Sequence, residues 1–509
     1  MNKIYQKECE SSCEYSLPDY LGDVKKILNV SASVIPSGKF VNDGEVNFSG
    51  VVSYDILYSD SEGKLSRITT SSDYDLSLPV DSDLYEDSFA EGRVANLSVR
   101  LTGPRKLTAK AVVSSNVKVS YNESLTCGGD AFADGNTPET VTCNISVEKT
   151  LFASSPEREY AEEAERLDGV SSDEIEVISA SGQTRILEAT PTENGVLVRG
   201  ELIITCIIRT TEQPPFAIKK TVPFEETVNL DGLMPDMQVL ADGYLSSVTA
   251  GVSDDVGGCV ITVNAISELY CMASKNEDAA LTKDAYLKNR ETCGKYEDLE
   301  YSSIVCMKTE EGSFTASVSR GDIGCENIRD ILTLGTDVRS FQKSITSGGF
   351  EISGDATVSG IACEINENGS IGYVPVKFTA PFKVFVSCNT SFPESAQLEC
   401  SVTPVETEGV LDAEKLTVKC MLKIGYRVTS CDFIRRMTEC SVVGDTEYKS
   451  CLSSITVYYP DEDESLFEIA KKFHTTGAKI ASDNSLSEQT LAGKDLPVSL
   501  SGVKKLIIR

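Results

Sequence analysis

One strand-like segment of the sequence occurs three times. It first occupies residues 44–58 and returns in altered form 150 and 304 positions later. Each copy alternates around one shared glycine, namely Gly50, Gly200 or Gly354. The alternating residues are Val46, Phe48, Val52, Tyr54, Ile56 and Tyr58, then Val196, Val198, Leu202, Ile204, Cys206 and Ile208, then Phe350, Ile352, Ala356, Val358, Gly360 and Ala362. A period of two predicts a strand that buries one face, with the glycine at a bulge or a close backbone approach.

Turn signals after each copy indicate that one β-rich module is used three times. In module one a turn at residues 59–64 is followed by expected strands at 66–70, 74–80, 95–102 and 107–119, and the other modules keep this rhythm. We therefore predict a mainly β fold: three antiparallel β-sandwich-like tandem modules, followed by a small α+β domain of strand, helix, helix and strand. A length of 509 residues suits three or four domains.

The expected domain boundaries follow the repeats. We place an N-terminal tail at 1–20, module one at 21–150, module two at 174–274, module three at 322–432 and the C-terminal domain at 453–509. The first eight residues are polar, which favours disorder. Connectors at 151–173 and 275–321 would let the modules reorient. The first connector contains residues 156–167, whose single apolar edge favours a helix lying on a neighbouring module.

Charge narrows the possible partners. The formal net charge is −31, so DNA, RNA and anionic membrane surfaces would be repelled. No apolar run reaches the roughly 20 residues of a membrane helix, and residues 1–9 lack the apolar core of a secretion signal. We expect a cytosolic protein with no nucleic-acid partner and no direct membrane insertion.

The cysteines do not suggest a disulfide framework or a metal site. There are 17 of them, scattered singly and without a CxxC pair. Cys9 and Cys13 are the closest two, and the single histidine, His474, is far away in the sequence. In a cytosol such residues are usually small buried apolar side chains. We expect no metal and no cofactor.

The C-terminal segment has a helical pattern. Residues 455–459 form an expected strand, and Ser465 with Glu468 three residues later is a capping box that starts a helix. Its apolar face is Leu466, Ile469, Ala470 and Phe473. A shorter helix is expected at 478–482, and a returning strand begins at 496–498. A domain this small has a thin core, so its exposed loops matter most.

Residues 464–473, Glu-Ser-Leu-Phe-Glu-Ile-Ala-Lys-Lys-Phe, resemble the signature of LysM domains, as do Asp483-Asn484 and the closing segment 491–498. Two departures are Asp463, where a glycine is usual, and Ala492, where a proline is usual. The resemblance implies a ligand groove between the loop before the first helix and the loop after the second. Its candidate residues here are Asp463, Glu464, Ser465, Leu466, Asp483, Asn484, Ser485 and Leu486. Alternatively, Ser465 only caps a helix, Leu466 fills the core and Asn484 caps a turn.

The three modules are similar to the repeats that precede a C-terminal LysM domain in SipL-type clostridial spore-coat morphogenetic proteins. The entry residues 17–20, Leu-Pro-Asp-Tyr, and 23–28, Asp-Val-Lys-Lys-Ile-Leu, are similar to the module entry of that family. The resemblance implies a scaffold in the mother-cell cytoplasm, recruited to the forespore surface, that binds the coat-basement ATPase SpoIVA through its LysM domain and promotes coat encasement. Other coat proteins are further candidate partners. The alternative function is binding of peptidoglycan or N-acetylglucosamine polymers, and a cytosolic location favours the protein ligand.

Catalysis has little support in the sequence. His474 follows a helix-face phenylalanine, which favours an exposed helix end over a catalytic base. Gly348-Gly349 precedes an expected strand, whereas phosphate-binding loops precede a helix. Tryptophan is absent and aromatic residues make up 7% of the chain, which weakens a sugar-stacking surface. We therefore expect a non-enzymatic protein.

Overall fold

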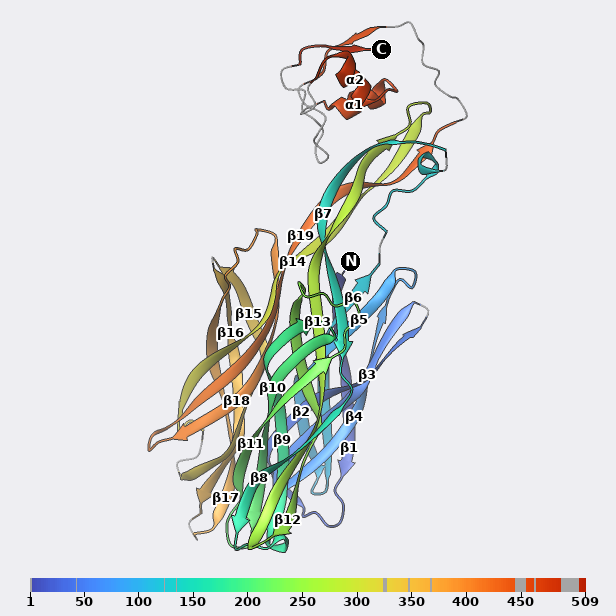
Figure 1. The fold of residues 1–509 in the computed structure, drawn as a ribbon. Coiled ribbons are helices and arrows are strands. Elements are labelled where there is room, and N and C mark those ends of the chain that lie inside the picture. The colour runs from blue at the N-terminus through green and yellow to red at the C-terminus, as the bar shows by residue number, and fades with distance from the viewer. Residues whose placement is uncertain are drawn as a thin grey trace.

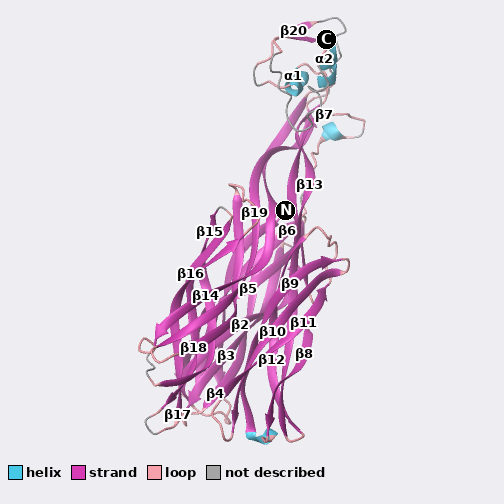
Figure 2. Ribbon diagram, turned by 60° about the vertical axis from the view of Figure 1, so that its left-hand side comes forward, coloured by secondary structure: helices cyan, strands magenta, loops and turns pink. Residues whose placement is uncertain are grey.

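The computed structural model describes residues 2–42, 44–122, 124–133, 135–323, 327–346, 348–366, 369–444, 455–461, 464–486 and 503–509. Strands dominate these residues, so the mainly β prediction is confirmed. The strands form an elongated body from which a narrow stalk rises, and two short helices lie beyond the end of the stalk (Figures 1 and 2). No described helix is long and apolar enough to cross a lipid bilayer.

The first six strands form two facing sheets, here called sandwich one. One sheet has the order β2-β3-β4 and the other β1-β6-β5, and all neighbours are antiparallel. The strands are β1 (Asn2–Ser16), β2 (Val24–Asn42), β3 (Glu45–Asp60), β4 (Leu65–Pro79), β5 (Tyr85–Gly103) and β6 (Lys106–Tyr121). Alternate side chains of β3, such as Tyr54 and Ile56, pack against Ala109 and Ala111 of β6 to form the core. The period of two in the sequence produces this buried face.

The same strand order occurs twice more. Sandwich two has the sheet β11-β10-β9 facing β12-β13, to which β7 and β8 are added along β13, and sandwich three has β15-β16-β17 and β14-β19-β18. The strands of sandwich two are β7 (Glu139–Ser154), β8 (Arg158–Asp168), β9 (Ile175–Thr192), β10 (Gly195–Thr210), β11 (Phe216–Val228), β12 (Gln238–Asp255) and β13 (Gly258–Tyr286). Those of sandwich three are β14 (Thr292–Ser319), β15 (Ile328–Thr346), β16 (Gly349–Ile365), β17 (Ile371–Ser387), β18 (Ala396–Leu411) and β19 (Lys415–Val442). Two short 3-10 helices, η1 (Asp130–Phe132) and η2 (Ser172–Glu174), lie between strands.

The segments predicted as tail and connectors are strands. β1 occupies most of residues 1–20, β8 lies in 151–173, and the end of β13 and all of β14 lie in 275–321. These three strands are equivalent, because β1 pairs with β6, β8 with β13 and β14 with β19. The predictions of a disordered start and of a helix at 156–167 are therefore wrong.

A β-bulge explains the mistaken helix. Tyr160, Ala164 and Leu167 are the partly buried residues of β8, and their spacing of four and three matches a helix face. The pairing of β8 with β13 shifts register next to Ala164, and the extra residue reverses which side chains face inward from there on. A glutamate-rich edge strand with one bulge thus imitates the period of a helix.

The shared glycine lies where two strands come close together, as predicted. A Cβ at Gly50 would lie 2.4 Å from the Ile35 carbonyl oxygen, and one at Gly200 would lie 2.4 Å from that of Arg185. At Gly354 the corresponding distance, to the carbonyl oxygen of Ser340, is 2.7 Å. The pairing with the neighbouring strand shifts register at Gly50 and at Gly200, and just after Gly354, between Asp355 and Thr357. The aromatic residues directly opposite the three glycines on the next strand are Tyr74, Phe224 and Phe382.

The three sandwiches close around a common axis. Contacts run in a cycle, with β4 of sandwich one against β9, β11 of sandwich two against β15, and β17 of sandwich three against β2. One buried cluster joins all three, and its members include two sets of residues at the repeat spacing. These sets are Leu28, Ile178 and Leu332, and Leu57, Ile207 and Ile361. The inner strands therefore meet in a small apolar core to which each module contributes the same repeat positions.

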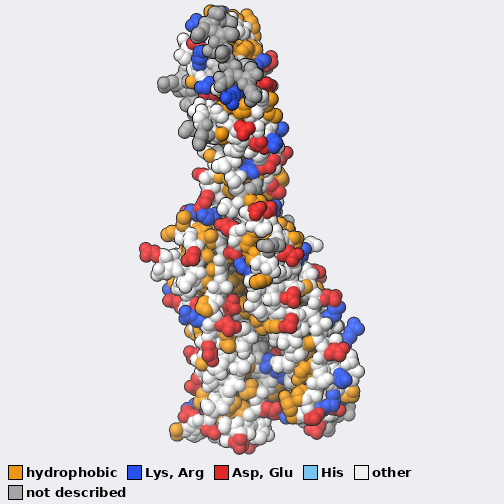
Figure 3. All heavy atoms as spheres, turned by 90° about the vertical axis from the view of Figure 1, so that its right-hand side faces the viewer, with side chains coloured by type: hydrophobic (Ala, Val, Ile, Leu, Met, Phe, Trp, Pro, Cys, Tyr) orange, Lys and Arg blue, Asp and Glu red, His pale blue; other side chains and the backbone are white. Residues whose placement is uncertain are grey.

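The stalk consists of β7, residues 270–286 of β13, residues 292–302 of β14 and residues 431–442 of β19. β7 pairs with β13, and β14 pairs with β19, along this length. Its own small core includes Cys143, Ile145, Leu281 and Leu299. On the face shown in Figure 3, acidic and basic side chains are interspersed over body and stalk.

The C-terminal domain contains β20 (Thr456–Tyr458), α1 (Leu466–Lys472), α2 (Gly477–Asp483) and β21 (Leu506–Ile508). β20 and β21 pair antiparallel. The capping box at Ser465 and Glu468 and the helix near 478–482 are confirmed. The closing segment 491–498 lies outside the described residues.

Candidate functional site

The loop before α1 is held by the residues that begin the helix. The Ser465 hydroxyl accepts a hydrogen bond from the Glu468 amide at 3.2 Å, and the Glu468 carboxylate accepts one from the Ser465 amide at 2.8 Å. This reciprocal pairing satisfies donors that a helix start leaves free. Leu466 is buried in the core of the domain. Ser465 therefore caps the helix and Leu466 fills the core, which are the structural roles given above as the alternative to ligand binding.

Glu464 connects this loop to β20. Both of its carboxylate oxygens accept from the Tyr458 hydroxyl at 2.8 Å. The Lys472 ammonium group donates to the same hydroxyl at 3.0 Å and lies over the tyrosine ring. The Tyr458 ring also meets Phe473 edge-on, with 5.2 Å between centroids. Asp463, the other acidic residue predicted here, lies outside the described residues.

The loop after α2 is held by Asn484. Its side-chain amide nitrogen donates to the carbonyl oxygens of Ile480 and Ile507, at 2.8 and 2.7 Å, and its oxygen accepts from the Ile507 amide at 2.6 Å. These bonds join the end of α2 to β21. Ser485 is exposed and has φ 52°, and Leu486 packs against the core. One carboxylate oxygen of Asp483 is buried and has no hydrogen-bond partner among the described residues.

The two loops approach the same small sheet. Glu464 contacts Tyr458 of β20, Asn484 contacts Ile507 of β21, and the register puts Tyr458 opposite Leu506 and Val457 opposite Ile507. Glu464 and Ser465 before α1, and Asn484 and Ser485 after Asp483 at the end of α2, thus belong to two loops attached to paired strands. A small rigid sheet that carries two loops is a common arrangement for recognition.

His474 is exposed just beyond the end of α1, as predicted, and its φ is 52°. Its amide donates to the Lys471 carbonyl at 3.3 Å, so its backbone helps to end the helix. Among the residues that the structure describes, no group of three or more His, Cys, Asp or Glu side chains could hold a metal ion.

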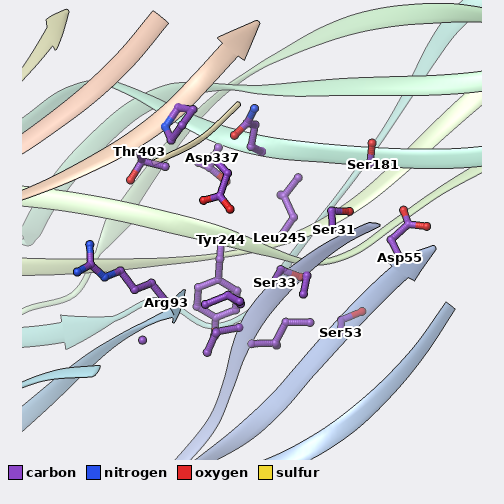
Figure 4. A pocket seen from close by; sticks show the side chains of 18 of the residues that line it. Ser31, Ser33, Ser53, Asp55, Arg93, Ser181, Tyr244, Leu245, Asp337 and Thr403 are labelled. Carbon is purple, nitrogen blue, oxygen red and sulfur yellow. The ribbon is translucent and has the colours of Figure 1, made fainter. Parts of the chain in front are cut away.

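A cavity of about 1290 Å³ lies between the three sandwiches. Its walls come from the inner strands of all three, and equivalent positions face it in turn, such as Ser31 and Ser181, or Ser33 and Asp337 (Figure 4). Several charged groups on the wall form ion pairs, such as Lys39 with Asp87 and Arg339 with Asp337. Arg67 binds Asp55 through two nitrogens at 2.8 and 2.9 Å. The wall of the cavity is therefore mixed, with apolar side chains, small hydroxyl side chains and charged groups.

Buried charges hold the wall of the cavity to the base of the stalk. Lys423 of β19 pairs with Asp242 of β12, and Arg427 of β19 pairs with Glu148 of β7 and with Glu399 of β18. Burial raises the pKa of the nearby Glu91 carboxyl, and the positive charge of Lys118 opposes this rise. These groups come from segments far apart in the sequence, so no local pattern in the sequence indicates them.

The family model described as SipL, SPOCS domain, matches residues 174–253. The matched segment runs from Glu174, the last residue of η2, through β9, β10 and β11 to Ser253 in β12. This similarity supports a relationship to SipL-type proteins of sporulation. No curated protein and no solved structure matches the chain.

Proposed function

We propose that this chain is a non-enzymatic scaffold of the spore envelope, built from three SPOCS-like modules and a C-terminal LysM-like domain. The observation that carries the proposal is the match of residues 174–253, together with the recurrence of the matched strand order in β2–β5 and β15–β18. A fold repeated three times around one axis offers many surfaces for partners.

The C-terminal domain is the proposed partner-binding end. Its strand, helix, helix, strand order agrees with the LysM resemblance of residues 464–473. It stands at the far end of the stalk, away from the body (Figure 1). The exposed side chain of Ser485 lies on one of its two loops, beside Asn484. The proposed partner is the coat-basement ATPase SpoIVA.

A pull-down tests this function. Purified full-length protein should retain SpoIVA, and a variant that lacks residues 455–509 should not. Retention by the deletion variant would refute binding through the C-terminal domain. Sedimentation of the full-length protein with purified cortex, and not with SpoIVA, would instead establish the glycan function.

The proposed site of action is the forespore surface in the mother-cell cytoplasm. A fluorescently tagged copy should form a ring around the forespore during sporulation. A diffuse signal throughout sporulation would contradict recruitment, because a coat scaffold must collect at that surface.

A further inference from the structure

The tip of the stalk contributes a residue to the core of the C-terminal domain. Tyr286, the last residue of β13, is 2% exposed and belongs to one cluster with Leu466, Ile469, Ile480 and Leu506. Its hydroxyl donates to the Thr475 carbonyl oxygen at 2.7 Å, just beyond α1. Its ring meets that of Phe467 edge-on, with 5.1 Å between centroids. A tyrosine distant in sequence thus occupies an interior position of this domain.

A salt bridge lies beside this contact. The Lys471 ammonium group of α1 donates to both carboxylate oxygens of Asp284 on β13, each at 2.7 Å. The Tyr296 hydroxyl of β14 donates to the same carboxylate at 2.9 Å. Asp284 is therefore held by the stalk in the position where it meets α1. Phe467 and Lys471 are four residues apart, so they lie on one side of α1, and this side faces the stalk.

The described part of the domain is too small to enclose a core alone. Both helices are 7 residues long and both strands are 3 residues long. Helices this short are unstable without packing partners, and domains this small bury little apolar surface. The side chain of Tyr286 is larger than any of the Leu, Ile and Ala side chains that are buried around it.

We propose that the tip of the stalk is a docking site that completes the C-terminal domain, with Tyr286 as its anchor and Asp284 fixing its orientation. The stalk and the domain then form one rigid unit. The side of α1 that carries Phe467 and Lys471 is occupied by the stalk, and the loops at Ser465 and Asn484 are presented at a fixed distance and angle from the body. The functional part of this inference, presentation of the loops to a partner, rests on the function proposed above.

Hydrogen exchange in the full-length protein tests the docking. The reporters are the helix amides of Ile469, Phe473, Ile480 and Asn484, each bonded to the carbonyl four residues earlier. Tyr286→Ala should speed their exchange at least tenfold and leave strands such as β3 and β10 unchanged. The control is Phe433→Ala, which removes an aromatic ring that is 70% exposed on the stalk. It should change the exchange of neither the helix amides nor the amides of β3 and β10. Unchanged helix exchange in Tyr286→Ala would overturn the proposal.

A double-mutant cycle covers the case in which Tyr286→Ala disturbs the whole stalk. Asp284→Ala and Lys471→Ala each remove one partner of the salt bridge and keep the tyrosine. Docking predicts that each single variant speeds helix exchange and that the double variant adds little to the larger single effect. Lys479→Ala, an exposed lysine on α2, is the control and should have no effect. Additive effects, or none, would overturn the proposal.

SpoIVA binding separates this inference from the proposed function. If the wild-type chain binds SpoIVA, Tyr286→Ala should weaken binding at least tenfold. Unweakened binding would contradict fixed presentation of the loops. If the wild-type chain does not bind, the proposed function fails, and the exchange experiments still decide whether the stalk completes the domain.

Discussion

Arg427 and Glu148 form an ion pair in the interior, with 6% and 0% of their side-chain areas exposed. The arginine Nε donates to one carboxylate oxygen at 3.0 Å, and its Nη1 donates to Glu399 at 2.6 Å. Because β19 belongs to sandwich three and β7 enters sandwich two, this pair joins two sandwiches where the stalk begins.

Glu148→Ala should destabilise the protein by about 3–5 kcal/mol, because it leaves the buried Arg427 charge with one carboxylate in place of two. The measurement is the free energy of unfolding in guanidinium chloride. Glu225→Ala is the matched control, since it removes the carboxylate of an ion pair with Arg199 in which both side chains are more than half exposed. Exposed pairs contribute less than about 1 kcal/mol. Equal losses in the two variants would contradict the structural role of the buried pair.

Gly200→Ala should destabilise sandwich two by about 1–3 kcal/mol, because the added methyl group would overlap the Arg185 carbonyl and the Phe224 ring. Gly251→Ala, in β12, places the same methyl group where nothing lies within 4 Å. That control should be neutral or slightly stabilising, because alanine restricts the unfolded chain. Comparing thermal midpoints of the two variants checks the prediction, and a harmless Gly200→Ala would disprove the close approach.

Asn484→Asp should loosen the join between α2 and β21 by about 1–3 kcal/mol. The carboxylate can still accept from the Ile507 amide, but it repels the two carbonyl oxygens to which the asparagine nitrogen donates. Faster hydrogen exchange at Ile507 and Asn484 would show the effect. Asn96→Asp, at an exposed position of β5, should leave those amides unchanged. Equal exchange in both variants would mean that the bonds of Asn484 do not hold the loop.

Buried thiols should make stability depend on pH in the alkaline range. Burial raises the pKa of Cys271 from 9.0 to about 12. The folded state therefore holds this proton more tightly than the unfolded state does. The resulting stabilisation is complete below pH 9 and is lost between about pH 9 and 12. Cys271→Ala should flatten the fall of the unfolding free energy over that range.

Thiol labelling provides an independent test of the same burial. At pH 8 an aromatic disulfide reagent should modify the exposed Cys293 and leave Cys271 unmodified until the protein unfolds. Peptide mapping assigns the label to each cysteine, and Cys293→Ser, which loses the label at position 293 and should leave Cys271 unmodified, is the control. Rapid modification of Cys271 in the native protein would contradict its place in the core.

The sequence predicts those parts of the fold that depend on local period. The alternation around Gly50, Gly200 and Gly354 correctly predicts β3, β10 and β16, and the capping box correctly predicts the start of α1. β8 could not be predicted in this way, because its bulge changes the spacing of inward residues and its pairing with β13 outweighs the helix preference of glutamate. Local signals cannot report a register shift that depends on a distant strand.

The candidate site was predictable only in part. Ser465 and Asn484 are in loops of the C-terminal domain, as their motif implies, and both make structural hydrogen bonds there. The contribution of Tyr286 is invisible in the sequence, because nothing near it suggests a domain that begins some 170 positions later. The same is true of Glu148 and Arg427, which are far apart in the chain and meet only in the folded protein.

The cyclic contacts of the three sandwiches fix how many copies the chain can use. An open array can gain a unit at either end, since each new unit touches only its neighbour. Here β17 of the last sandwich already lies against β2 of the first, so the circle is complete. A fourth sandwich would have to break the contact between β17 and β2 and separate Leu28 from Leu332. The closed arrangement therefore has no place for a fourth sandwich made by a further duplication of the module.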